Sequence, residues 1–411
     1  MKQVLKQKSL RLRLKSLSKN ILLQLLILFV VALNFGSFFP LPVKTFLYNV
    51  SLSLQSILIM ALPVIIFGCI YNCMLEQKGK ALGFVFALFV AVALANACSA
   101  LFAYGLGTLV IQTHPNLFSV SAVTGVEKLS AMAWALTEPF FKLDNRYPLS
   151  FGLVLGLWFV FFPHPKADEA GHFLSKIIKI FLKQCFTPVL PLFTFGFMLN
   201  MQHTGMLSQI VSKYLPLFLL IFAAIGIYLI LFFALAAAFK PRAWFRYVKN
   251  LLPAGFMGFS TMSSLATMPL TLEATDKNTE HQHMHTRDMA KAIIPATVNI
   301  HLVGNSIATI VMVMVLLLTF GKPAFTVPGF LKFLVEFVQV KFAVAAIPAG
   351  GIIVMLPVLK SSLFFTEEMA ALITSLYILL DPLITAGNIL GNGAFALIFP
   401  KLFKKLQNQR I

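Results

Sequence analysis

The sequence predicts an all-α polytopic membrane protein with eight transmembrane helices and two re-entrant helical hairpins. Of its 411 residues, 59% are hydrophobic and only 11% are charged, whereas about a quarter of the residues in an ordinary soluble domain are charged. Apolar segments of the roughly 20 residues needed to cross a bilayer recur along the chain. We expect these segments to be helical, because backbone polar groups inside lipid must be hydrogen-bonded within the chain.

Eight apolar segments are expected to span the membrane as helices. Their approximate limits are 21–40, 50–71, 81–111, 149–162, 177–201, 215–239, 290–320 and 369–399. Two further apolar segments, 251–272 and 342–357, are interrupted by Pro and Gly residues: Pro253, Gly255, Gly258 and Pro269 in the first, and Pro348, Gly350, Gly351 and Pro357 in the second. Broken backbone at membrane depth is tolerated only where protein or a water-filled cavity receives it. A kinked ordinary helix pair is the simpler alternative for either segment alone.

The basic residues indicate how the chain is oriented in the membrane. The formal net charge is +19, and basic clusters lie beside apolar segments at 1–20, 240–249 and 401–410. Such clusters mark the cytoplasmic side and suit anionic lipid headgroups, whereas a nucleic-acid surface would carry aromatic platforms on a soluble fold. Both termini are cytoplasmic only if each broken segment enters and leaves on one side, the first from inside and the second from outside. Two hairpins of opposite orientation are typical of transporters with inverted repeats.

Asp381 is the acid that lies plainly inside an apolar span. A carboxylate there costs about 2.5–3.5 kcal/mol, so it usually serves a bound cation, an ammonium group or a proton. Steps of four, three and four residues lead from it to Thr385, Asn388 and Asn392, which therefore share its helix face. A polar stripe of this kind faces a cavity or a partner helix. Polar contacts between helices explain one or two such residues better than four.

Polar and small residues also gather in the two broken segments and between them. The first segment carries Ser263 and Ser264 in a Ser-rich turn, whose hydroxyls and free amides suit a carboxylate. The second carries Ala346, Pro348 and Gly350, and small residues let the backbone approach a ligand closely. The span between the segments contains Thr297, Asn299, His301, Asn305 and Ser306.

Four motifs in order along the chain resemble the dicarboxylate/amino acid:cation symporter family, which has the glutamate-transporter fold. They are the Ser-rich segment 260–273, the stretch 295–299, the stretch 347–351 and the stretch 381–391. Residues 58–63 also resemble the second-helix motif of this family, so the resemblance covers nearly the whole chain. It implies a secondary transporter and not an enzyme. It further implies a homotrimer in which a mobile transport domain moves like an elevator against a static scaffold.

The resemblance also implies a division of the chain. Residues 1–20 and 401–411 are expected to be basic cytoplasmic tails, residues 21–75 and 149–207 scaffold helices, and residues 81–111 a transport-domain helix. Residues 212–400 would complete the transport domain, with hairpins at about 251–275 and 342–365. The expected location is the lipid bilayer of a bacterial inner membrane.

By matching position, the resemblance assigns roles to individual residues. Asp381 would hold a substrate amino group, Asn388 and the region of Ser264 its carboxylate, and Thr385 would lie beside its side chain. The implied substrate-binding set is Ser263, Ser264, Ala346, Pro348, Gly350, Asp381, Thr385 and Asn388. The implied cation-coupling set is Ser99, Thr297, Asn299, His301, Asn388 and Asn392. A coupling ion, sodium or a proton, is expected, with no other metal and no cofactor.

Departures from the family pattern bear on the substrate. Members that take acidic substrates carry an arginine near the side-chain carboxylate, but the matching positions here are Ile384 and Met262. A buried carboxylate without a cation is costly, so we expect an amino acid that is neutral rather than acidic. Gly391-Asn392 resembles the dicarboxylate branch instead, while Asp381 argues against a substrate without an amine. Dicarboxylate or glutamate/aspartate symport, exchange and channel activity remain as alternatives.

Two acidic sodium ligands of the family are replaced here by Asn392 and His301. A histidine carries a proton near neutral pH, so His301 is the candidate proton carrier, with a neutral hydrogen-bonded histidine as the alternative. The alternating histidines of 280–285 offer nitrogen ligands for a transition metal, but we expect this stretch to be a solvated cytoplasmic loop.

Overall fold

The computed structural model describes residues 21–75, 82–117, 129–130, 132, 146–204, 206–344 and 350–408. The secondary structure of these residues is helical, with no strand among them. Three of the described helices are long and apolar enough to cross a membrane, at Gly83–Thr113, Leu215–Ala236 and Glu367–Lys404. The helical class expected from the sequence is therefore present, and the chain carries membrane-length helices.

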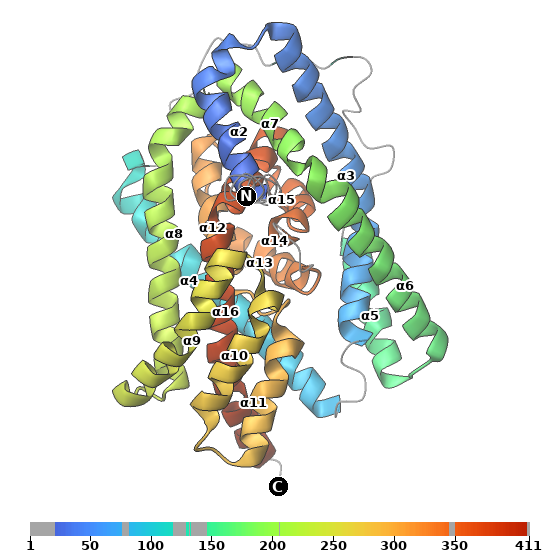
Figure 1. Cartoon of the computed structure of the whole chain (residues 1–411), viewed down its shortest axis with the longest axis vertical. Helices are drawn as coiled ribbons and strands as arrows, with labels where there is room; N and C mark the ends of the chain where they lie inside the picture. The colour runs from blue at the N-terminus through green and yellow to red at the C-terminus, as the bar shows by residue number, and fades with distance from the viewer. Residues whose placement is uncertain are drawn as a thin grey trace, which may run out of the picture.

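Five helices from the N-terminal half pack mainly against one another (Figure 1). They are α2 (Ile21–Phe35), α3 (Leu41–Leu75), α5 (Arg146–Phe161), α6 (Pro165–Ile180) and α7 (Thr187–His203). The long helix α3 contacts α5, α6 and α7, and α2 contacts α7. At Gly196 of α7 the two backbones approach closely, because a Cβ there would collide with Leu47 O and Ser51 Oγ of α3.

The remaining helices gather around α16 (Glu367–Asn408), which runs through the middle of this group in Figure 1. They are α4 (Leu82–Thr113), α8 (Met206–Ala236), α9 (Pro241–Thr261), α10 (Ser264–Thr279), α11 (Met284–Thr297), α12 (Val303–Thr319), α13 (Val327–Lys341), α14 (Gly350–Ile353) and α15 (Leu356–Leu363). Helix α16 contacts every helix from α7 to α12. Most of its length is buried. Its polar residues therefore contact other parts of the protein and not lipid, where they would be costly.

The first broken segment is a pair of helices joined by a sharp turn. Helix α9 ends at Thr261, because Met262 adopts the left-handed conformation with φ +51°. Ser263 then caps α10, its side chain accepting a hydrogen bond of 3.2 Å from the amide of Ala266. The pair runs over 241–279, wider than the expected limits of 251–275.

The expected span 290–320 is not a single helix, because the helix is interrupted at 298–302. Asn96 of α4 satisfies the interrupted backbone: its amide nitrogen donates to Ile300 O at 2.7 Å, and its oxygen accepts from the Leu302 amide at 3.0 Å. Non-helical backbone in an apolar interior requires such partners. The break therefore depends on a side chain about 200 residues away in the sequence.

The second broken segment begins earlier than expected. Residues 327–341, which the sequence analysis left outside any span, form α13, and the chain returns through α14 and α15. Thr326 caps α13 by accepting a hydrogen bond of 3.2 Å from the Gly329 amide. Ala346 and Pro348, assigned to the substrate site by resemblance, lie outside the described residues.

Several other expected limits are also corrected. Helix α3 begins at Leu41 rather than near residue 50, and α8 begins at Met206 rather than near 215. Helix α6 lies between the expected spans 149–162 and 177–201 and takes up the start of the second, and a short π-helical segment, Phe181–Phe186, follows it. At the C-terminus, α16 continues through Asn408, so most of the expected tail 401–411 is helical.

A polar cluster joins α10 and α11 beyond the first broken segment. Both carboxylate oxygens of Asp276 accept hydrogen bonds from Arg287, at 2.7 and 2.5 Å, and Lys291 Nζ lies 3.2 Å from Asp276 Oδ1. In the predicted topology this cluster is cytoplasmic. The hydrogen bond from Arg287 lowers the pKa of Asp276 to about 2, from an ordinary value of 3.8.

We expect this cluster to make stability depend on acid. Because the folded-state pKa of Asp276 is depressed, its contribution is fully present above pH 4 and is lost as the pH falls through about 2. The unfolding temperature of the wild type should therefore fall more between pH 4 and 2 than that of Asp276→Asn. Glu273→Gln is the control, since Glu273 pairs only with exposed Lys277 on its own helix in the described residues. Equal acid sensitivity of wild type and Asp276→Asn would contradict the prediction.

Candidate functional site

The polar stripe of α16 is buried inside the protein. Asp381, Thr385, Asn388 and Asn392 are between 3% and 7% exposed. The Thr385 hydroxyl lies 3.4 Å from Asp381 Oδ1, one helical turn away, and donates to it. The stripe thus places a carboxylate, a hydroxyl and two amides along one face that lipid does not touch.

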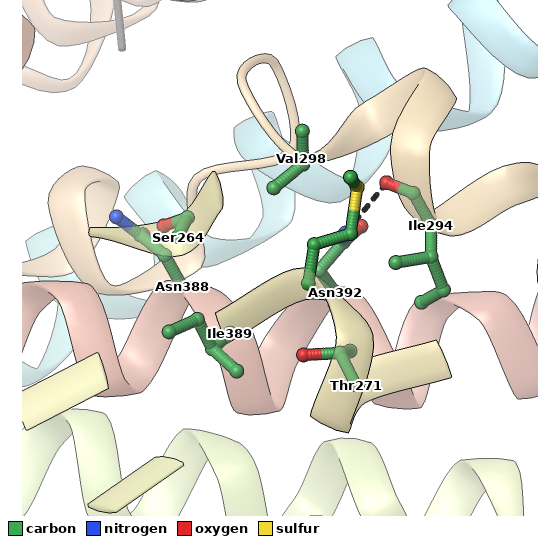
Figure 2. A pocket seen from close by; sticks show the side chains of 8 residues that line it. Ser264, Thr271, Ile294, Val298, Asn388, Ile389 and Asn392 are labelled. Atoms are coloured by element: carbon green, nitrogen blue, oxygen red, sulfur yellow. Dashed lines mark hydrogen bonds between the residues drawn. The ribbon is translucent and has the colours of Figure 1, made fainter. Parts of the chain in front are cut away.

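A small cavity lies between α10, α11 and α16, beside the C-terminal half of this stripe (Figure 2). Its lining consists of Ser264, Met268, Thr271, Ile294, Val298, Asn388, Ile389 and Asn392. Figure 2 shows Asn388 and Asn392 reaching it from α16, with Ser264 and Thr271 facing them from the first helix pair. The lining offers hydroxyl, amide and apolar groups but no charged side chain. It suits the neutral polar or apolar part of a ligand.

Asn392 connects this cavity to the end of α11. Thr297 Oγ1 lies 2.6 Å from Asn392 Oδ1 and 2.8 Å from Ile293 O, so its single proton is donated to one of them at a time. The Asn392 amide donates to Ile294 O at 3.3 Å, the bond drawn in Figure 2. Two residues expected to couple a cation, Thr297 and Asn392, are therefore in direct contact. Both present oxygen atoms, which a hard cation prefers.

Asn388 connects the stripe to the start of α12. Its side-chain oxygen accepts a hydrogen bond of 3.0 Å from the backbone amide of Asn305. Gly304 permits this contact, because α12 and α16 meet there almost backbone to backbone. The interruption at 298–302 thus sets the register that places Asn305 against Asn388.

Asn305 is the centre of a second polar group, whose other two members, Tyr377 and Lys341, were not predicted. Its side chain hydrogen-bonds the hydroxyl of Tyr377 through Nδ2 and accepts from Lys341 Nζ through Oδ1. Lys341 is fully buried and its Nζ lies 4.0 Å from the centre of the Phe337 ring. Lys341 was not predicted, although a charged residue within an apolar region is the same signal that identified Asp381.

Ser99 lies one helical turn from Asn96, whose side chain binds the interrupted backbone at 298–302. Its hydroxyl donates to Asn96 O at 2.9 Å, and both residues are fully buried. Asn96 was not predicted, although a lone amide in the apolar segment 81–111 is the kind of residue that serves a neighbouring chain segment. Asn299, expected to coordinate a cation, is half-buried in the interruption itself.

His301 is fully buried between aromatic rings. Its ring is 4.4 Å from that of Phe395 and 6.0 Å from that of Phe232, centre to centre and nearly parallel. Neither ring nitrogen has a hydrogen-bond partner among the described residues. Protonating the ring in this arrangement would bury a cation without an acceptor. Proton uptake at His301 therefore requires a conformation in which the ring reaches water or an acceptor.

Two further residues predicted to bind the substrate, Ser263 and Gly350, lie where a helix begins in each of the two broken segments. Ser263 caps α10 and is half-buried, and Gly350 is buried at the start of α14. His281 and His283 are exposed. The described residues contain no group of three or more His, Cys, Asp or Glu side chains that could hold a metal.

The Sodium:dicarboxylate symporter family model matches residues 151–402, well over half of the chain. The chain belongs to this family. The match runs from α5 to α16 and contains both broken segments and the whole polar stripe. A comparison with curated proteins found no match.

Membership of the symporter family establishes the general activity and confirms the resemblance seen in the sequence. The protein is an integral membrane secondary transporter, not an enzyme, whose transport is coupled to a cation, and the family implies sodium coupling and a glutamate-transporter fold. Its substrate is a small molecule. The symporter's buried carboxylate, and the hydroxyl and amide oxygens in the lining of its cavity, are chemically suited to this task, since an ammonium group and a hard cation both require oxygen acceptors.

Proposed function

We propose that this symporter carries a neutral amino acid together with sodium or a proton. The observation that supports this most directly is that buried Asp381 shares a helix face with Asn388 and Asn392, which line a cavity that has no charged lining residue. Asp381 would hold the amino group, and Asn388 with Ser264 would hold the carboxylate through an amide and a hydroxyl. The side chain would then lie near Thr385 and the apolar residues beside it.

The residues at the two positions where an arginine would mark an acidic substrate also favour a neutral substrate. Ile384 is fully buried on α16, at the place where family members with acidic substrates carry an arginine. Met262, at the turn between α9 and α10, is the other matching position. A substrate side-chain carboxylate at either would have no cation beside it and would lose its hydration without compensation.

We further propose an elevator movement in a trimer, with eight spans and two re-entrant hairpins. The packing supports a mobile part around α16 and a scaffold of α2, α3, α5, α6 and α7, because each set packs mainly within itself. The proposed location is a bacterial inner membrane with both termini in the cytoplasm, based on the basic clusters at 1–20 and 401–410.

Uptake by the full chain in proteoliposomes tests this function. Labelled neutral amino acids, aspartate, glutamate and succinate are supplied in turn, with a sodium gradient or a proton gradient imposed in separate runs. We expect saturable accumulation of a neutral amino acid above that of protein-free liposomes. Uptake that needs sodium and is independent of pH would exclude His301 as the proton carrier.

A dicarboxylate or glutamate/aspartate symporter is the second candidate, favoured by the Gly391-Asn392 sequence and by the dicarboxylates that the family description names. Accumulation of succinate or aspartate alone would support it and overturn the argument from Ile384. Counterflow without net accumulation would indicate an exchanger, and flux that does not saturate would indicate a channel.

A further inference from the structure

Lys341 is a fully buried lysine at the end of α13. Its Nζ contacts Asn305 Oδ1 and lies 4.0 Å from the centre of the Phe337 ring, and these are its polar and aromatic contacts among the described residues. An amide oxygen and a ring face both attract a cation. Placing a lysine in the interior of a membrane protein is expensive, so its position indicates a function.

The place of Lys341 in the second broken segment is informative. Helix α13 reaches Asn305 through Lys341, and helix α14 reaches it through Gly351, where a Cβ would collide with Asn305 Nδ2 and the Tyr377 hydroxyl. Helix α16 holds the same amide through Tyr377. Both arms of the segment and α16 therefore meet at the Asn305 side chain, and Lys341 Nζ contacts the oxygen atom of that side chain.

Lys341 lies at one end of a chain of polar side chains that leads toward Asp381. Tyr377 and Asp381 are one turn apart on α16, so a chain of polar groups leads from Lys341 through Asn305 and Tyr377 to the face that carries Asp381. A buried carboxylate without a compensating cation is strongly unfavourable.

We infer that the Lys341 ammonium group is a built-in monovalent cation. It holds the two arms of the second broken segment together at Asn305, in place of a bound metal cation at this junction, and it balances Asp381 when no substrate ammonium is present. The inference rests on the cation coupling of the family. The role of Lys341 at Asn305 does not depend on which substrate is carried, whereas its role toward Asp381 rests on the amine of the proposed substrate.

The unfolding temperature of the purified full chain tests this, measured in detergent with sodium chloride or choline chloride at equal ionic strength. Lys341→Ser removes the charge and leaves space for an ion. We expect this variant to gain a saturable rise in unfolding temperature with sodium that exceeds any rise in the wild type. Lys332→Ser is the matched control, because Lys332 lies on the same helix and is exposed. A sodium response of Lys341→Ser equal to that of the wild type would overturn the inference.

Uptake into proteoliposomes gives a second measurement. At the lowest sodium concentration that still supports wild-type uptake, Lys341→Ser should transport at least about tenfold more slowly than the wild type, and saturating sodium should restore part of this loss. Lys341→Met keeps the length of the side chain but neither charge nor space, so sodium should not restore its uptake. If Lys341→Ser does not fold, Lys341→Met provides the test, because uptake equal to that of the wild type at this low sodium concentration would refute the built-in cation. The thermal measurement requires no transport, so an error in the proposed substrate would not affect it.

Discussion

Replacing Asp381 by asparagine is expected to reduce amino-acid uptake by at least about 100-fold, because removing one charge of a buried pair costs about 2–5 kcal/mol. Asp381 is 6% exposed and is positioned by the Thr385 hydroxyl. Asparagine keeps the shape of the side chain but cannot offer a negative charge to a substrate ammonium. Initial uptake rates at equal amounts of reconstituted protein measure the effect.

Two comparisons make this result specific. Asp288→Asn is the control, since the Asp288 side chain is 61% exposed and pairs only with Lys291 on its own helix in the described residues; its uptake should equal that of the wild type. The same elution volume in size-exclusion chromatography would show that Asp381→Asn is folded. Undiminished uptake by folded Asp381→Asn would mean that the substrate has no amine held there, as expected for a dicarboxylate.

Gly304→Ala is expected to destabilise the protein by about 1–3 kcal/mol, the usual cost of overpacking, and to lower uptake with it. A Cβ at this position would collide with Ile384 O and would lie 3.1 Å from Asn388 N and 3.2 Å from Gly387 Cα. These are backbone atoms of α16 and cannot rotate away. Helices α12 and α16 must therefore separate, which also disturbs the hydrogen bond between Asn305 and Asn388.

Gly226→Ala is the matched control for this substitution. Gly226 lies in the middle of α8, and a Cβ there would meet no atom within 4 Å. Because alanine favours the helix over glycine by roughly 0.5–1 kcal/mol, this variant should be unchanged or slightly more stable. Thermal unfolding in detergent measures both variants. Similar unfolding temperatures for Gly304→Ala and Gly226→Ala would refute the close approach of α12 and α16.

Much of the candidate site could be predicted from periodicity. Asp381, Thr385, Asn388 and Asn392 recur at helical spacing in an apolar segment, and the structure buries all four. Their partners could not be predicted in the same way. Asn305 reaches Asn388 across 83 positions of the sequence, and Thr297 reaches Asn392 across 95. Local spacing contains no information about contacts at such separations.

The missed elements have a common physical cause. The stretch 298–302 contains neither Pro nor Gly, so nothing local requires its helix to stop there. The stop is stabilised by Asn96 on another helix. Helix α13 was missed because it has 15 residues and is interrupted by Lys332, Glu336 and Lys341, so it does not form a continuous apolar span. Only the packed structure shows that Lys332 is exposed and that Lys341 is buried.

The sequence by itself determined the membrane class, the helical secondary structure, the family and the polar face of the last long helix. These follow from composition, segment length and spacing, which act locally along the chain. The tertiary structure decided where the helices break, which polar groups meet in the cavity, and that a lysine lies next to Asn305. Those features depend on contacts between distant segments, because a buried polar group is stable only where another part of the chain provides its partner.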